Sequence, residues 1–152
     1  MPPPAFLSSA RSTFLRFLAA MAAGNLLWEI SHVPLYTLWV TGSWGEIAYA
    51  VLHCTVGDVM IGGICLLLSL AVLGGNAWPM LRFGVVAGAT ILLALLYTIF
   101  SEWLNTEVRE SWTYRDAMPR LPILGTGLTP VLQWIVVPAL AFRWSLPRTV
   151  RQ

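Results

Sequence analysis

The chain has 152 residues, of which 57% are hydrophobic and only 11% are charged, and its mean hydropathy is +0.72. Soluble domains contain about 25% charged residues, and disordered chains combine low hydrophobicity with high charge, so both classes are excluded. The nine basic residues, all arginine, outnumber the seven acidic ones and lie singly along the chain, so nucleic acid is not expected as a partner. The two cysteines lie in apolar stretches, which is neither a disulfide framework nor a zinc signature.

Four stretches of the chain are long and apolar enough to cross a bilayer, which takes about 20 residues. They are residues 14–40, 46–73, 80–104 and 123–146. Glycine-containing turns separate the first three, and the longer polar segment 105–122 separates the last two. Pro34 lies inside the first stretch, where membrane helices tolerate proline as a kink. The sequence therefore predicts one all-α domain, 1–152, folded as an integral membrane four-helix bundle.

The arginines predict the orientation of this bundle. Six lie beside the ends that would share one side of the membrane: Arg11, Arg16, Arg82, Arg143, Arg148 and Arg151. The segment 105–122 carries three arginines, but three acidic residues neutralise them. The positive-inside rule then predicts that both termini are cytoplasmic and that 105–122 is an outer loop. The expected location is the bacterial cytoplasmic (inner) membrane, with membrane lipids as neighbours.

Each predicted helix carries polar residues along one face, although an ionisable group in a span costs about 2.5–3.5 kcal/mol. At about 100° per residue, the polar residues of the first helix fall within a sector about 60° wide; they are Asn25, Glu29, His32 and Tyr36. In the second helix, one face carries Glu46, Tyr49, His53 and Gly57, while Asp58 points about 140° away from His53. The third and fourth helices contribute Thr98, Glu102, Thr129 and Gln133.

These polar faces lie at similar depth in the outer half of the predicted bundle, so we expect them to face one another. The predicted catalytic residues are Glu29, His32, His53 and Glu102, and the loop 105–122 is expected to cap the pocket. The predicted substrate-pocket residues are Asn25, Tyr36, Asp58, Gln133, Trp112, Tyr114 and Arg115. Near the inner end, the spacing of Gly84 and Gly88 suggests tight helix packing.

The most specific local motif is the pair Glu29 and His32, three residues apart on one helix. A carboxyl group beside an imidazole can exchange a proton with a substrate or share a metal ion. The segment from Asn25 to Glu29 resembles the N-x-x-W-E stretch around an acidic residue of fungal integral-membrane terpene cyclases. The resemblance covers five residues, and it implies a functional acid at Glu29.

Three function classes stay open from the sequence. The first is an enzyme that acts on a lipid or isoprenoid-like substrate by acid–base or metal-assisted chemistry, with Glu29, His32, His53 and Glu102 as candidate metal ligands. The second is a b-type haem protein in which His32 and His53, the only histidines, ligate the iron. The third is a non-catalytic accessory or assembly subunit of a membrane complex, in which the polar residues only join helices, as buried amides and carboxyls often do.

Overall fold

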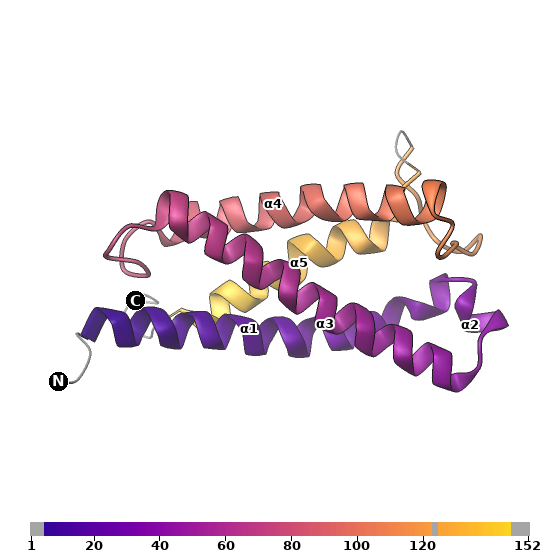
Figure 1. Cartoon of the computed structure of the whole chain (residues 1–152), viewed down its shortest axis with the longest axis horizontal. Helices are drawn as coiled ribbons and strands as arrows, with labels where there is room; N and C mark the ends of the chain where they lie inside the picture. Colours follow the sequence, from indigo (N-terminus) through magenta and orange to yellow (C-terminus); the bar gives the residue numbers. More distant parts are fainter. Residues whose placement is uncertain (1–4, 123–124, 147–152) are drawn as a thin grey trace.

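The computed structural model describes residues 5–122 and 125–146, and it confirms an all-α bundle of four main helices. These are α1 (Ala5–His32), α3 (Trp44–Ser69), α4 (Phe83–Trp103) and α5 (Leu128–Ser145), with a short α2 (Leu38–Thr41) between the first two. Both α1 and α4 pack against α3 and α5, so the four helices form a closed ring. Figure 1 shows that α3 crosses the bundle diagonally, whereas α1 and α4 run along its length.

The first predicted helix does not continue to residue 40, and this expectation was wrong. α1 ends at His32, a single 3-10 turn follows (Val33–Leu35), and Tyr36 is extended before α2 begins. Pro34 explains the break, because proline lacks the amide hydrogen that would continue the helix and disfavours helical backbone in the residue before it. Tyr36 then forms an isolated antiparallel bridge with Tyr114, which brings a distant loop over the end of α1.

α3 begins with a capping box. The Ser43 hydroxyl accepts from the amide of Glu46 at 3.3 Å, and the Glu46 carboxylate accepts from the amide of Ser43 at 2.8 Å. Such a box satisfies amides that a helix end leaves unbonded. Glu46 therefore lies exposed at the start of the helix. Its position on the predicted polar face had suggested that it would join the polar interior, and it does not.

Single π-helical turns extend α3 through Leu70–Gly74 and α4 through Leu104–Val108. The resulting stretches, Trp44–Gly74 (31 residues) and Phe83–Val108 (26 residues), are long and apolar enough to cross a membrane. The fourth predicted span began at 123, but residues 123 and 124 lie outside the described part and α5 begins at Leu128.

The apolar core occupies the half of the bundle where α1 begins and α5 ends. It includes Phe17, Met21, Leu66, Val86 and Phe142, and the rings of Phe17 and Phe142 lie 4.4 Å apart. Close helix approaches occur at other glycines than the sequence suggested. A Cβ on Gly24 would lie 2.8 Å from Val137 Cγ1, and one on Gly62 would lie 2.9 Å from Met21 Cε.

Gly84 and Gly88, by contrast, are exposed, and a Cβ at either would meet no atom of the described chain within 4 Å. The expected tight packing at this pair is therefore wrong within the single chain. The small-residue spacing alone did not distinguish a buried helix face from an outer one.

Candidate functional site

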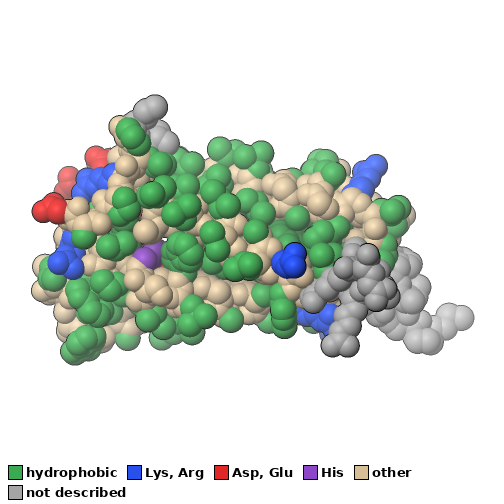
Figure 2. All heavy atoms as spheres, turned by 180° about the vertical axis from the view of Figure 1, so that it is seen from behind, with side chains coloured by type: hydrophobic (Ala, Val, Ile, Leu, Met, Phe, Trp, Pro, Cys, Tyr) green, Lys and Arg blue, Asp and Glu red, His purple; other side chains and the backbone are tan. Residues whose placement is uncertain are grey.

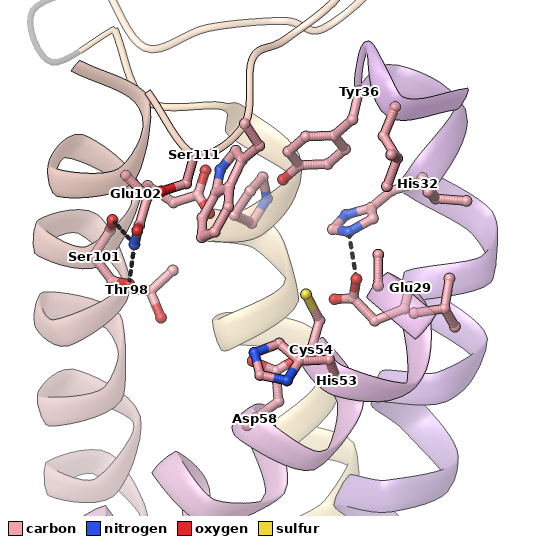
Figure 3. A pocket seen from close by; sticks show the side chains of 18 of the residues that line it. Glu29, His32, Tyr36, His53, Cys54, Asp58, Thr98, Ser101, Glu102 and Ser111 are labelled. Carbon is pink, nitrogen blue, oxygen red and sulfur yellow. Dashed lines mark hydrogen bonds and ion pairs between the residues drawn. The ribbon is translucent and has the colours of Figure 1, made fainter. Parts of the chain in front are cut away.

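A cavity of about 700 Å³ lies at the opposite end of the bundle from the apolar core. Its walls come from the end of α1, the first half of α3, the end of α4 and the start of α5. The four predicted catalytic residues, Glu29, His32, His53 and Glu102, all line this cavity, which Figure 3 shows from close by. The diagonal course of α3 carries Asp58, about 21 Å along that helix from Trp44, to the same place.

The amide nitrogen of Gln133 is the meeting point of three helices. It lies 3.0 Å from Asn25 Oδ1, 3.0 Å from Glu29 Oε1 and 2.8 Å from Asp58 Oδ2. An amide nitrogen carries only two hydrogens, so three acceptors compete for two donors. Two carboxylates that contact one nitrogen repel each other unless one holds a proton or a cation lies near them. The cluster is therefore built to hold a proton or a positive charge.

Glu29 and His32 form the closest acid–base pair of the cavity. His32 Nε2 lies 3.1 Å from Glu29 Oε2, and both residues are buried, with 6% and 7% of their surface exposed. The second ring nitrogen of His32, Nδ1, has no hydrogen-bond partner among the described residues. Glu29 accepts from Gln133 with its other oxygen, so its carboxylate is held from two directions.

Glu102 lies at the end of α4 and is joined to the loop that follows. The Tyr114 hydroxyl donates to Glu102 Oε2 and accepts from the amide of Gly127 at 3.1 Å. Burial, and then the nearby Glu102 carboxylate, raise the pKa of Tyr114, so this phenol stays a donor. The guanidinium of Arg120 lies over the Tyr114 ring, 5.2 Å from its centre. Tyr114 thus fixes both the Glu102 side chain and the start of α5.

The loop after α4 closes one end of the cavity, where Trp112 and Thr113 line the wall. Arg115 does not line the cavity; its guanidinium donates to the Pro34 carbonyl at 2.8 Å. The hydroxyls of Thr37 and Thr113 lie 2.7 Å apart, and the Thr37 amide donates to the Thr113 carbonyl at 3.0 Å. The turn at Pro34 therefore binds the loop after α4 through hydrogen bonds that join Pro34 to Arg115 and Thr37 to Thr113.

The face that α3 turns to the cavity is wider than the predicted one: Tyr49, His53 and Gly57 line the cavity, and so does Cys54. Asp58, predicted for the pocket although it points away from His53, lines the cavity and contacts Gln133. His53 also lines it but is exposed, and its ring stacks on the exposed Tyr49, with centres 5.5 Å apart. His53 is therefore a rim residue. Asp58 takes the interior position, where its carboxylate accepts from Gln133 of α5.

The other predicted pocket residues divide into two groups. Tyr36, Trp112 and Gln133 line the cavity, whereas Asn25 and Tyr114 contact lining residues from behind. Side chains that line the cavity but were not proposed for the site include Thr37, Cys54, Tyr97, Ser101, Glu110 and Trp134. Trp134 belongs to the apolar core as well as to the cavity wall. Ser101 lies four residues before Asn105, so helical spacing could have placed it on the same face of α4.

Metal ligation does not follow from this arrangement. Within residues 5–122 and 125–146, no group of three or more His, Cys, Asp or Glu side chains is placed to hold a metal ion. Glu29, His32, His53 and Glu102 share a cavity but do not converge on one point. The chemistry that the geometry offers directly is proton exchange at the Glu29–His32 pair.

Comparisons of the chain with protein-family models, with curated protein sequences and with solved structures find no match. A function can therefore be assigned to the cavity only from its residues and their geometry.

Proposed function

We propose that this chain is an integral membrane protein with both termini cytoplasmic, and that its cavity catalyses acid–base chemistry on a hydrophobic substrate. The observation that carries the catalytic proposal is the buried Glu29–His32 pair at 3.1 Å in the wall of a 700 Å³ cavity. The membrane location, the substrate and the reaction are each open to the separate tests below.

The distribution of side chains supports the membrane location. In Figure 2, hydrophobic side chains cover the middle of the molecule, and most charged side chains lie toward its two ends. Of the arginines described, Arg11, Arg16, Arg82 and Arg143 belong to the end where α1 begins and α5 ends. The exposed acidic residues Glu46, Glu107, Glu110 and Asp116 belong to the other end. An excess of arginine favours the cytoplasmic side.

Cysteine labelling tests this orientation. Arg82→Cys and Arg109→Cys place one thiol at each end of the bundle, in a background in which Cys54 and Cys65 are replaced by serine. A membrane-impermeant maleimide added to intact spheroplasts is expected to label the cysteine at 109 and to reach the one at 82 only after lysis. Labelling with the reverse preference overturns the orientation, and equal labelling of both before lysis overturns the membrane location.

The acid–base proposal assigns a distinct task to each nitrogen of His32. An ionised Glu29 accepts a hydrogen bond from His32 Nε2, as the carboxylate of a catalytic triad does from its histidine. This arrangement fixes the tautomer with a hydrogen on Nε2 and leaves the lone pair of Nδ1 free. Nδ1 is the buried nitrogen without a described partner, so it is the atom that takes a proton from the substrate. Gln133 supports the ionised form of Glu29 by donating to its other oxygen.

The rim of the cavity supports a hydrophobic substrate. Tyr49, His53 and Tyr97 line the cavity and are exposed on α3 and α4, the two helices that are apolar enough to cross a membrane. Their exposed neighbours on the same helices include Leu52, Val56, Leu93 and Leu96. A lipid-soluble molecule can therefore reach the polar interior from the apolar flank. The b-type haem alternative is less favoured, because His53 lies at the exposed rim and Nε2 of His32 faces Glu29.

The test compares cells that express the wild-type chain, Glu29→Gln, His32→Gln or Glu107→Gln, with untargeted mass spectrometry of their lipid extracts. Glu107→Gln is the matched control, since Glu107 is an exposed carboxylate outside the cavity wall. We expect at least one lipid-soluble compound to change with the wild-type chain and with Glu107→Gln, but not with the other two variants. Circular dichroism and size-exclusion chromatography test whether each variant folds.

Two outcomes refute the acid–base proposal. In the first, folded Glu29→Gln and His32→Gln change the same compounds as the wild-type chain. In the second, both variants fail to fold while Glu107→Gln folds, which would assign the pair to helix association and favour an accessory subunit.

A further inference from the structure

The chemistry of the whole cavity wall indicates which substrates it accepts. Among the described residues that line it are four carboxylates, from Glu29, Asp58, Glu102 and Glu110, and no arginine or lysine. Two arginines of the loop that caps the cavity are engaged elsewhere: Arg115 donates to the Pro34 carbonyl, and Arg120 lies over the Tyr114 ring. The described walls of the cavity are therefore acidic, with Glu29 and Glu102 buried and Glu110 exposed.

The same wall carries aromatic rings at several heights. They are contributed by Tyr36, Tyr49, Tyr97, Trp112 and Trp134. Aromatic faces attract organic cations through the ring quadrupole, and the attraction is strongest where water is excluded. Trp134 is 2% exposed and Trp112 is half-buried, so two indoles lie away from bulk water. Carboxylates and aromatic rings in one cavity are the combination that recognises an ammonium group.

The interior also contains a buried polar atom that has no hydrogen-bond partner among the described residues. His32 is 6% exposed, its side chain lines the cavity in Figure 3, and Nδ1 has no described hydrogen-bond partner. Buried polar groups are bonded in most folded proteins, so unbonded ones that line a cavity point to a ligand.

We propose that the cavity binds an amphiphilic organic cation, an amine or quaternary ammonium compound whose charged group lies among the carboxylates and whose apolar part extends past Tyr49 and Tyr97. This inference rests on the proposed function only for the fate of the ligand, because binding itself needs no proton transfer. In an acid–base reaction, the carboxylates neutralise the ammonium group and hold it beside His32. A neutral or anionic lipid of the same size lacks this anchor.

The test uses two ions of the same shape and opposite charge, tetraphenylphosphonium and tetraphenylborate. Isothermal titration calorimetry measures their binding to the protein in phosphatidylcholine nanodiscs, and empty nanodiscs report partition into lipid. We expect saturable binding of the cation and none of the anion. Glu102→Gln keeps the acceptor for Tyr114 but removes a charge, so it should weaken cation binding about thirtyfold. Glu107→Gln, five residues further along the chain, is the matched control and should bind as the wild type does.

Equal binding of the two ions, or no saturable binding of either, overturns the inference on the wild-type protein alone. Unchanged cation affinity in folded Glu102→Gln and Trp112→Leu also overturns it. The phosphonium ion has no transferable proton, so its binding is independent of catalysis. If the cation binds but Glu29→Gln and His32→Gln leave the lipid profile unchanged, the acid–base proposal is refuted and the cation site stands. If the cation does not bind but the two variants abolish the change in the lipid profile, only the cation site is refuted.

Discussion

Replacing Gln133 by leucine should destabilise the bundle strongly, because one amide links three helices. Gln133 is 3% exposed, and its nitrogen lies within 3.0 Å of acceptors on α1 and α3. Its two hydrogens satisfy two of these acceptors at a time. A hydrogen bond between membrane helices contributes about 0.6 kcal/mol on average and at most about 1.7, and one to a charged group about 1.5–3 kcal/mol. Gln133→Leu should therefore lower the free energy of unfolding by about 2–4 kcal/mol.

Steric trapping of the doubly biotinylated protein in lipid bicelles measures this change. The matched control is Leu132→Ala, a neighbouring position on α5 that is 40% exposed and should change the free energy of unfolding by less than about 0.5 kcal/mol. A double-mutant cycle with Asn25→Leu should give a coupling energy of about 0.5–1.7 kcal/mol, because the two amides lie in contact. The reasoning is refuted if Gln133→Leu unfolds within about 0.5 kcal/mol of the wild type, or if the cycle gives no coupling.

Two further predictions concern helix packing and the cap. Gly24→Val should lower the free energy of unfolding by about 1–3 kcal/mol, because a Cβ there meets Val137 at 2.8 Å. The control Gly84→Val, at a position where a Cβ meets no described atom, should leave the free energy of unfolding unchanged. Equal effects of the two variants in the same assay would contradict the packing described. Tyr114→Phe removes the hydroxyl that joins Glu102 to the start of α5, so proteolysis of the cap should become faster with the bundle intact; an unchanged cleavage rate would show that other contacts hold the cap.

Much of the architecture was predictable from the sequence because it depends on local composition. The number of long helices follows from hydrophobic stretches and the turns between them, and the structure confirms an all-α bundle of four main helices. Spacing at helical periodicity also identified Glu29 and His32 as neighbours, since residues three apart on a helix meet on one face. Trp44–Gly74 and Phe83–Val108 are long and apolar enough to cross a membrane, and this composition is again a local property.

Other features depended on contacts between distant segments, and periodicity could not fix them. The sequence predicted both His53 and Asp58 for the pocket but on different faces of one helix, and the tertiary structure leaves His53 at the exposed rim while it brings Asp58 into contact with Gln133. The Pro34 carbonyl, just beyond the end of α1 at His32, accepts a hydrogen bond from Arg115 of a distant loop, 81 positions along the chain.

The centre of the candidate site was decided only by tertiary structure. Gln133 lies 108 positions from Asn25 and 75 from Asp58, and nothing in the local sequence near any of the three specifies that they share one amide nitrogen. The sequence determined that each helix has a polar face, because residue spacing along a helix fixes which side chains lie together. Which of those side chains meet across the bundle depends on the tilt and rotation of each helix, and these are set by the packing of the apolar core at the other end.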